Sequence, residues 1–193
     1  ILEKRFGLWL IERYGSIEKA LAHWDNFTEK RDDPKAGRVQ VLDVWNITRE
    51  GLSHWEGGKP RRMSDQARFM AELQLKFYDE TRDFIRQDLR SSQLVVASNW
   101  TTADNPLLLP IEHLTNSSCD ILDRHGYFNC EHKGYQAAWS VHDDQKFKDR
   151  PGVLEPEELP IRCIQVAGKP QIISEIGWPL PNRFRAEAPL VCS

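Results

Sequence analysis

Hydrophobic residues recur at helical spacing in the first part of the chain. Over residues 3–14 the apolar side chains follow a period near 3.6, which predicts an amphipathic helix. Gly15 is placed to end this helix, and Ser16 is placed to cap a second helix over residues 17–24. The residues predicted to face a core are Phe6, Trp9, Leu10 and Tyr14 in the first helix and Ile17, Ala20, Leu21 and Trp24 in the second.

A polar, irregular stretch follows over residues 25–63. It contains two groups of helix-breaking residues, 32–37 and 56–60, and between them a mixed segment, 39–45, that fits either a short strand or the start of a helix. We therefore expect residues 1–63 to form a separate insertion of helices and loops.

The most regular pattern lies over residues 65–89 and follows Ser64. Apolar residues recur there every three or four positions on one face, and the opposite face is charged. The apolar positions are Ala67, Met70, Leu73, Phe77, Thr81, Phe84 and Ile85. This pattern predicts a long helix that covers a core with that one face.

Three later segments, 94–98, 119–125 and 170–174, are apolar runs with little polar alternation. Such runs are typical of strands buried on both faces of a parallel sheet. A helix followed by buried strands favours an α/β fold, although residues 129–169 show no clear amphipathic helix. We expect residues 64–193 to form this α/β part of the chain.

Composition and charge narrow the function classes. The chain has 193 residues, with 26 Lys and Arg against 29 Asp and Glu, for a net charge of −3. This balance lacks the basic surface that nucleic-acid binding requires, and no apolar run is long enough for a membrane span, so neither partner is expected. No signal peptide is visible, which leaves the compartment open, an extracellular or periplasmic one included.

Four cysteines allow three disulfide pairings, and nothing in the sequence selects one. Cys119, Cys130 and His132 lack the spacing of a zinc site. No metal and no cofactor are therefore predicted.

Polar and aromatic residues close each of the three predicted strands. Because ligands bind at the carboxyl ends of parallel strands, these residues are expected to converge on one pocket. They are Asn99 and Trp100 after the first strand, Asp123, His125 and Tyr127 at the second, and Glu175 and Trp178 at the third. A carboxylate, an imidazole, a phenol and indole rings together fit a carbohydrate site.

Each of these residues also has a purely structural interpretation. Strand ends are often polar for solvation alone, a carboxylate there can be an ion-pair partner, and tryptophan is common in protein cores. What favours function is the combination, above all Glu175, which is flanked by an apolar strand and by Trp178. A partly desolvated carboxylate of this kind is typical of catalytic sites.

These motifs resemble the clan of retaining glycoside hydrolases with a (β/α)8, or TIM, barrel, in particular its cellulase-like and β-galactosidase-like members. His125-Gly126-Tyr127 looks like the end of the sixth barrel strand, and residues 169–177 (K-P-x-x-x-S-E-x-G) look like the seventh. Residues 94–100 are similar to the fifth strand, and residues 14–24 resemble an insertion after the fourth. The resemblance covers most of residues 1–187.

The resemblance implies a role for each residue. Glu175 would be the nucleophile that forms a glycosyl-enzyme intermediate, Tyr127 would hydrogen-bond it and keep it ionised, and His125 would orient polar groups. Trp100 and Trp178 would stack on sugar rings, with Asn99 and Asp123 as further substrate-binding residues. The expected substrate is an oligosaccharide or polysaccharide.

The chain also departs from the family's pattern. The family's acid/base is a glutamate that follows an asparagine, and this sequence has no Asn-Glu dipeptide. A complete barrel usually needs about 250 residues. We therefore expect these residues to be the carboxyl-terminal part of a longer barrel, about strands five to seven, with the acid/base outside them; Glu112, Asp123 or Glu131 could replace it.

Two other functions stay open. One is a non-catalytic carbohydrate-binding domain that keeps the aromatic pocket but has no turnover. The other is an unrelated metal-dependent hydrolase with ligands drawn from His113, His125, His132 and Asp123.

Overall fold

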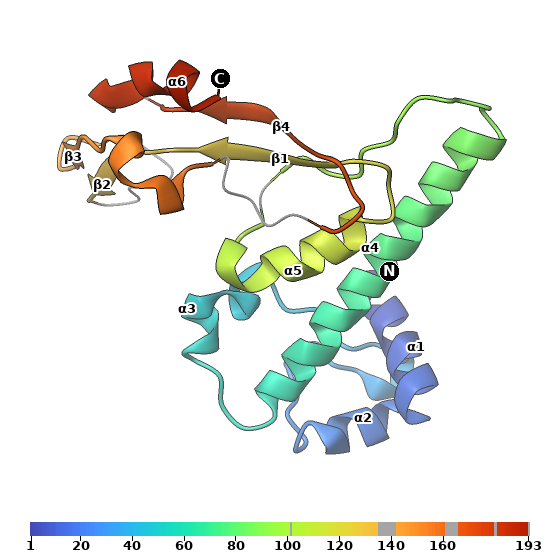
Figure 1. Ribbon diagram of the computed structural model, residues 1–193. Helices are drawn as coiled ribbons and strands as arrows, with labels where there is room; N and C mark the ends of the chain where they lie inside the picture. Colours follow the sequence, from blue (N-terminus) through green and yellow to red (C-terminus); the bar gives the residue numbers. More distant parts are fainter. Residues whose placement is uncertain (101, 135–141, 161–165, 180, 193) are drawn as a thin grey trace. The chain divides into compact units, whose positions relative to one another are not determined.

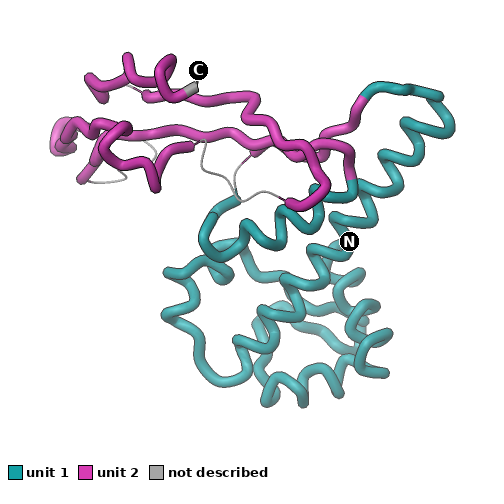
Figure 2. Tube along the Cα trace, viewed as in Figure 1, with its two compact units in different colours: residues 1–93, 102–118 teal, residues 94–101, 119–193 magenta. Residues whose placement is uncertain are grey.

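A computed structural model describes residues 1–100, 102–134, 142–160, 166–179 and 181–192. The fold is mixed α/β, as predicted, and its elements are shown in Figure 1. The chain divides into two compact units (Figure 2). Unit 1 consists of residues 1–93 and 102–118, and unit 2 of residues 94–101 and 119–193. This division differs from the predicted boundary after residue 63, because the long helix belongs to the same unit as the segment before it.

The first two helices of unit 1 confirm the sequence pattern. Helix α1 spans Leu2–Tyr14 and ends at Gly15, whose φ of 86° is a left-handed conformation that favours glycine. Helix α2 spans Ile17–His23, and the Ser16 side chain accepts a hydrogen bond from the Lys19 N–H at 3.2 Å. The carboxyl end of α1 and the amino end of α2 are therefore capped by the two residues that the sequence predicted.

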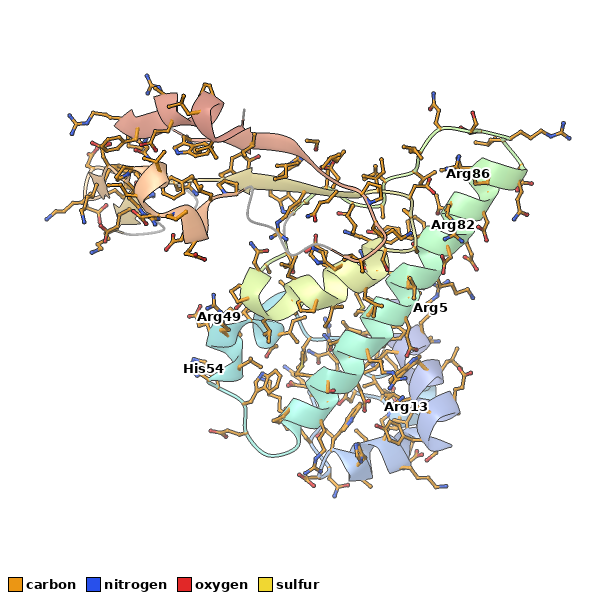
Figure 3. All side chains as sticks on the ribbon, in the orientation of Figure 1. Arg5, Arg13, Arg49, His54, Arg82 and Arg86 are labelled. Carbon is orange, nitrogen blue, oxygen red and sulfur yellow. The ribbon has the colours of Figure 1, made fainter. Side chains whose placement is uncertain are left out.

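The segment between α2 and the long helix contains only short helices. These are η1 (Pro34–Ala36), η2 (Val44–Ile47) and α3 (Arg49–Leu52). Residues 39–43 form neither a helix nor a strand, but Val39 is fully buried. Figure 3 shows Arg49 on α3, where its Nε lies 3.0 Å from Asp104 Oδ1.

Helix α4 spans Lys59–Gln87 and begins before Ser64, the predicted start. Pro60 lies in its first turn, where a missing backbone N–H costs nothing. The predicted core face is confirmed only in part: Leu73 packs against the core, but Phe77 is 61% exposed, and Phe84 and Met70 are also exposed. The buried residues of α4 are Arg62, Met63, Asp65, Gln66 and Phe69.

Helix lengths explain this difference. At about 1.5 Å per residue, the 29 residues of α4 extend roughly 44 Å, whereas the 13 residues of α1 extend roughly 20 Å. The core of unit 1 therefore covers only the first turns of α4. Its buried residues are Phe6, Leu10, Ile17, Ala20, Trp24, Val39 and Phe69.

Helix α5 (Asn105–Asn116) follows the first apolar run and was not predicted. Pro106 in its first turn and Pro110 in its interior conceal the helical pattern. Near the end of α4, Arg82 (Figure 3) donates a hydrogen bond to the carbonyl of Ser118, which follows the end of α5. None of the helices in the described part of the chain is both long enough and apolar enough to cross a membrane.

Unit 2 contains a small parallel sheet of β1 (Leu122–Tyr127) and β4 (Gln171–Gly177). The first predicted strand contributes a single parallel bridge, Val96 to Ile121. The parallel arrangement was predicted, but burial on both faces was not borne out for β4, where Ile172 is exposed. The other elements of unit 2 are β2 (Glu131–Lys133), antiparallel to β3 (Lys146–Lys148), and η3 (Gly152–Leu154), η4 (Pro156–Glu158), η5 (Arg183–Glu187) and α6 (Ala188–Cys192).

Candidate functional site

The carboxyl ends of three neighbouring extended segments meet in unit 2. The His125 N–H donates to the Asn99 carbonyl at 2.8 Å, so the segment that ends at Asn99 lies beside β1. On the other side of β1, the ladder pairs His125 with Glu175 and Tyr127 with Gly177. The structure therefore brings the carboxyl ends of all three predicted strands to one edge of the sheet. The contact that places Asn99 there is made by its backbone carbonyl.

Two side chains of β1 approach the Glu175 carboxylate, one at each oxygen. The Tyr127 hydroxyl donates a hydrogen bond to Glu175 Oε1, and His125 Nδ1 lies 3.3 Å from Glu175 Oε2. His125 and Tyr127 are two positions apart on one strand, so both face the same side of the sheet. The His125 side chain is 11% exposed and that of Glu175 is 54% exposed, so the carboxylate is both positioned and accessible.

Trp100 lies beside this group. Its ring meets the imidazole of His125 in an edge-to-face arrangement, with 5.9 Å between centroids and 72° between the ring planes. The residue is 62% exposed. An exposed indole beside the imidazole that approaches Glu175 provides the flat apolar surface that sugar rings stack on.

Asp123 is placed differently from the expectation. It is almost fully buried, and its Oδ1 accepts hydrogen bonds from the backbone N–H groups of Arg124 at 2.7 Å and Ser174 at 2.9 Å. The Oδ1 atom of Asp123 is therefore engaged with the backbone of the sheet, a contact different from the predicted one, and substrate binding by Asp123 stays a prediction. The contact of Asp123 with Ser174 was not foreseen, because no sequence pattern indicates it.

Trp178 is also placed differently. It is only 5% exposed and packs on Phe128, with 5.8 Å between ring centroids. A Cβ added at Gly152 would lie 2.8 Å from the indole nitrogen of Trp178, which shows how closely the backbone approaches this ring. Trp178 is therefore a core residue in this structure, and its ring offers no free face for stacking.

The other carboxylates considered as an acid/base lie in different settings. Glu131 on β2 is 3.1 Å from Lys133 Nζ and 3.4 Å from Lys148 Nζ. Hydrogen bonds from these two lysines hold the pKa of Glu131 below its usual value. Glu112 belongs to α5 in unit 1.

The histidines proposed as metal ligands are dispersed. His113 is buried on α5 in unit 1, and His132 stacks on Phe147 at 4.2 Å between centroids. Among the residues that the structure describes, no three His, Cys, Asp or Glu side chains gather in a group that could hold a metal ion.

Two of the cysteines can be described. Cys119 and Cys130 are both buried, and burial raises the pKa of the Cys130 thiol. Cys163 and the side chain of Cys192 lie outside the described part of the chain, so the disulfide pairing stays open.

Unit 1 has a concave feature of its own. An open groove of about 740 Å³ lies there, and within it Arg31 forms a 2.7 Å ion pair with Glu3. The groove is lined by Leu2, Glu3, Glu29, Lys30, Arg31, Gln40, Val41, Leu42 and Asp43. Its charged residues are of both signs, which indicates no particular ligand.

Comparison with known proteins found no matching family model, no matching curated protein and no matching solved structure. The function of the site must therefore be argued from its own geometry.

Proposed function

We propose that this chain is part of a retaining glycoside hydrolase and that Glu175 is its nucleophile. The observation that carries the proposal is the arrangement around Glu175. One carboxylate oxygen accepts a hydrogen bond from Tyr127, and the other lies 3.3 Å from His125 Nδ1, with the exposed Trp100 beside the imidazole. A positioned, accessible carboxylate next to an aromatic surface is what nucleophilic attack on a sugar ring requires.

The reaction proceeds in two displacements. A Glu175 oxygen forms a bond to the anomeric carbon while the bond to the leaving oxygen breaks. The electron pair of that bond stays on the leaving oxygen, which takes a proton from the acid/base. Water then attacks the same carbon, gives a proton back to the acid/base and releases the carboxylate, so that the configuration of the sugar is retained. Tyr127 and His125 act by holding the carboxylate in the orientation of attack.

The same proposal assigns the sheet to a (β/α)8 barrel. The order of the segments supports it, because the segment ending at Asn99, β1 and β4 are neighbours and parallel, and α5 lies between the first two in the sequence. These are the features of successive barrel strands. The second carboxylate, the acid/base, would then come from another part of the barrel and stand roughly 5–5.5 Å from Glu175.

Covalent labelling tests the nucleophile directly. A 2,4-dinitrophenolate group leaves readily without protonation, so glycosides that carry it reduce the need for the acid/base. We would incubate the full-length protein with 2,4-dinitrophenyl 2-deoxy-2-fluoro glycosides of glucose, galactose, mannose and xylose, and map any adduct by peptide mass spectrometry. The expected result is one fluoroglycosyl group on Glu175.

Variants separate catalysis from binding. Glu175→Ala should abolish turnover of the matching 2,4-dinitrophenyl glycoside, and azide should restore part of it as a glycosyl azide. Glu187→Ala is a matched control, because this carboxylate also lies in unit 2 but bonds to the backbone N–H of Gly152. Full activity of Glu175→Ala, or an adduct on another residue, would refute the assignment. Sugar binding by the native protein without labelling or turnover would support the non-catalytic alternative instead.

A further inference from the structure

The β1–β4 ladder changes register just before the candidate nucleophile. Asp123 pairs with Ile172, and the next pair is His125 with Glu175. Between these two pairs, β1 advances by two residues while β4 advances by three. A single residue of β1, Arg124, therefore lies opposite two residues of β4, and this is a β-bulge in β4.

The exposure of β4 side chains shows the same irregularity independently. From Gln171 to Ser174, partly buried and exposed residues alternate, as expected for a strand. Glu175 is then exposed directly after the exposed Ser174, and Ile176 and Gly177 are both partly buried. The extra residue therefore reverses the side of the sheet that each later residue of β4 faces.

This step decides which way Glu175 points. Partners in a ladder face the same side of the sheet, and successive residues face opposite sides. In a regular strand that continued from the Asp123–Ile172 pair, His125 would pair with Ser174, and Glu175 would pair with Gly126 on the other face. Because of the bulge, Glu175 faces the same side as His125 and Tyr127.

A bulge leaves a backbone group without its ladder partner, and here the Asp123 side chain supplies one. The Ser174 N–H donates to Asp123 Oδ1 at 2.9 Å, and the same oxygen accepts from the Arg124 N–H at 2.7 Å. Ser174 immediately precedes Glu175. Since the carboxylate is almost fully buried, these two bonds are sheltered from competition with water.

We propose that Asp123 is a positioning residue that stabilises the β4 bulge and thereby turns Glu175 toward His125 and Tyr127. The inference rests on the proposed function only for its catalytic consequence, since the structural claim stands by itself. Asp123 does not touch the sugar, which distinguishes this role from a substrate-binding one.

The structural claim is tested by NMR without any substrate. In the native protein the Ser174 amide proton should lie downfield and should exchange slowly with solvent, as a sheltered, hydrogen-bonded proton does. In Asp123→Ala both features should disappear, and the Glu175 carboxyl carbon should shift as its neighbours change. In Asp123→Asn the amide oxygen still accepts both bonds, so the Ser174 amide proton should stay downfield and protected from exchange. Asp149→Ala is the matched control, because Asp149 Oδ1 accepts the Arg183 N–H at 2.9 Å elsewhere in unit 2.

The catalytic consequence is tested by the rate of fluoroglycoside labelling. Displacement of a reacting group by about 1 Å can cost about 100-fold in rate. Asp123→Ala should therefore lower the maximal labelling rate by roughly 10- to 100-fold with the half-saturating concentration nearly unchanged, and Asp123→Asn should recover most of the rate. Asp149→Ala should label like the native protein.

The outcomes separate the two proposals. A Ser174 amide proton that is neither downfield nor protected from exchange in the native protein overturns the positioning role, whether or not Asp123→Ala folds. A loss of affinity rather than rate in Asp123→Ala also overturns it and returns Asp123 to substrate binding. If the native protein is not labelled at all while the NMR results are as expected, the proposed function fails and the role of Asp123 in orienting Glu175 stands.

Discussion

The ion pair of Arg62 and Asp32 is expected to be the most sensitive electrostatic contact of unit 1. Arg62 Nη1 and Nη2 donate to Asp32 Oδ2 and Oδ1 at 2.6 and 2.9 Å, and the two side chains are only 0% and 3% exposed. The same carboxylate accepts the backbone N–H groups of Glu29 and Gln40, both at 2.7 Å. Replacing Asp32 by Ala leaves a buried guanidinium without its counter-ion and frees these two N–H groups.

The expected cost follows from this geometry. Removal of one partner from a buried ion pair typically costs about 3–5 kcal/mol in the free energy of unfolding, because the remaining charge stays desolvated. Arg62 retains its 2.7 Å bond to the Gln40 carbonyl, which offsets part of the loss. We therefore expect Asp32→Ala to destabilise unit 1 by about 3 kcal/mol.

Urea unfolding followed by tryptophan fluorescence measures this change, because Trp24 is buried with its ring centroid 5.2 Å from the Arg62 guanidinium carbon. Glu80→Ala is the control, since the Lys76–Glu80 pair is exposed on α4 and should contribute less than about 0.5 kcal/mol. A loss below about 1 kcal/mol in Asp32→Ala would contradict the argument.

The pH dependence gives a second check on the same pair. Burial alone would raise the pKa of Asp32, but hydrogen bonds from Arg62 and from the backbone of Glu29 and Gln40 outweigh it, and the pKa is lowered. A lowered pKa means that the stabilisation is complete above the unfolded value of about 3.9 and is lost as the pH falls through the folded-state value. The difference in unfolding free energy between the native protein and Asp32→Ala should therefore be constant from pH 7 to 5 and shrink toward pH 3.

Two further predictions concern the site of unit 2 and the start of α4. Tyr127→Phe removes the hydroxyl that donates to Glu175 and should lower the fluoroglycoside labelling rate by roughly 10-fold. The urea unfolding midpoint should be unchanged, which is the control. An unaffected labelling rate would show that this hydrogen bond does not position the nucleophile. Gly58→Ala should destabilise unit 1 by more than about 1 kcal/mol, because a Cβ there would overlap the Trp24 carbonyl oxygen; an unchanged urea midpoint would contradict this close approach.

Much of the local structure of this protein follows from short-range chemistry and could be predicted. The α1–α2 junction depends on Gly15 and Ser16, which act within one helical turn of their own positions. The strands β1 and β4 were found from their apolar runs in the same way. Helix α5 was not predicted because Pro110 interrupts the pattern of helix-forming residues. The helix forms nevertheless, with one side of it buried.

Which surfaces are buried depends on contacts between distant segments. The periodic pattern of α4 predicted a helix, but packing against the core that α1 and α2 help to form decides that Phe69 is buried while Phe77 is not. Trp178 likewise has a side chain that could stack on a sugar, but it is a core residue because Phe128 packs on its ring and the backbone of Gly152 approaches it closely. Periodicity identifies a face, whereas only packing shows which part of that face has a partner.

For the candidate site, the sequence by itself determined the chemical groups and the strands that carry them: Glu175, His125 and Tyr127 at strand ends. The tertiary structure decided that they face one another. In a strand the facing direction alternates with every residue, so a single extra residue in β4 reverses it. That extra residue becomes visible only when β4 is paired with β1, and its stabilisation by Asp123 joins a side chain to a backbone N–H 51 residues away.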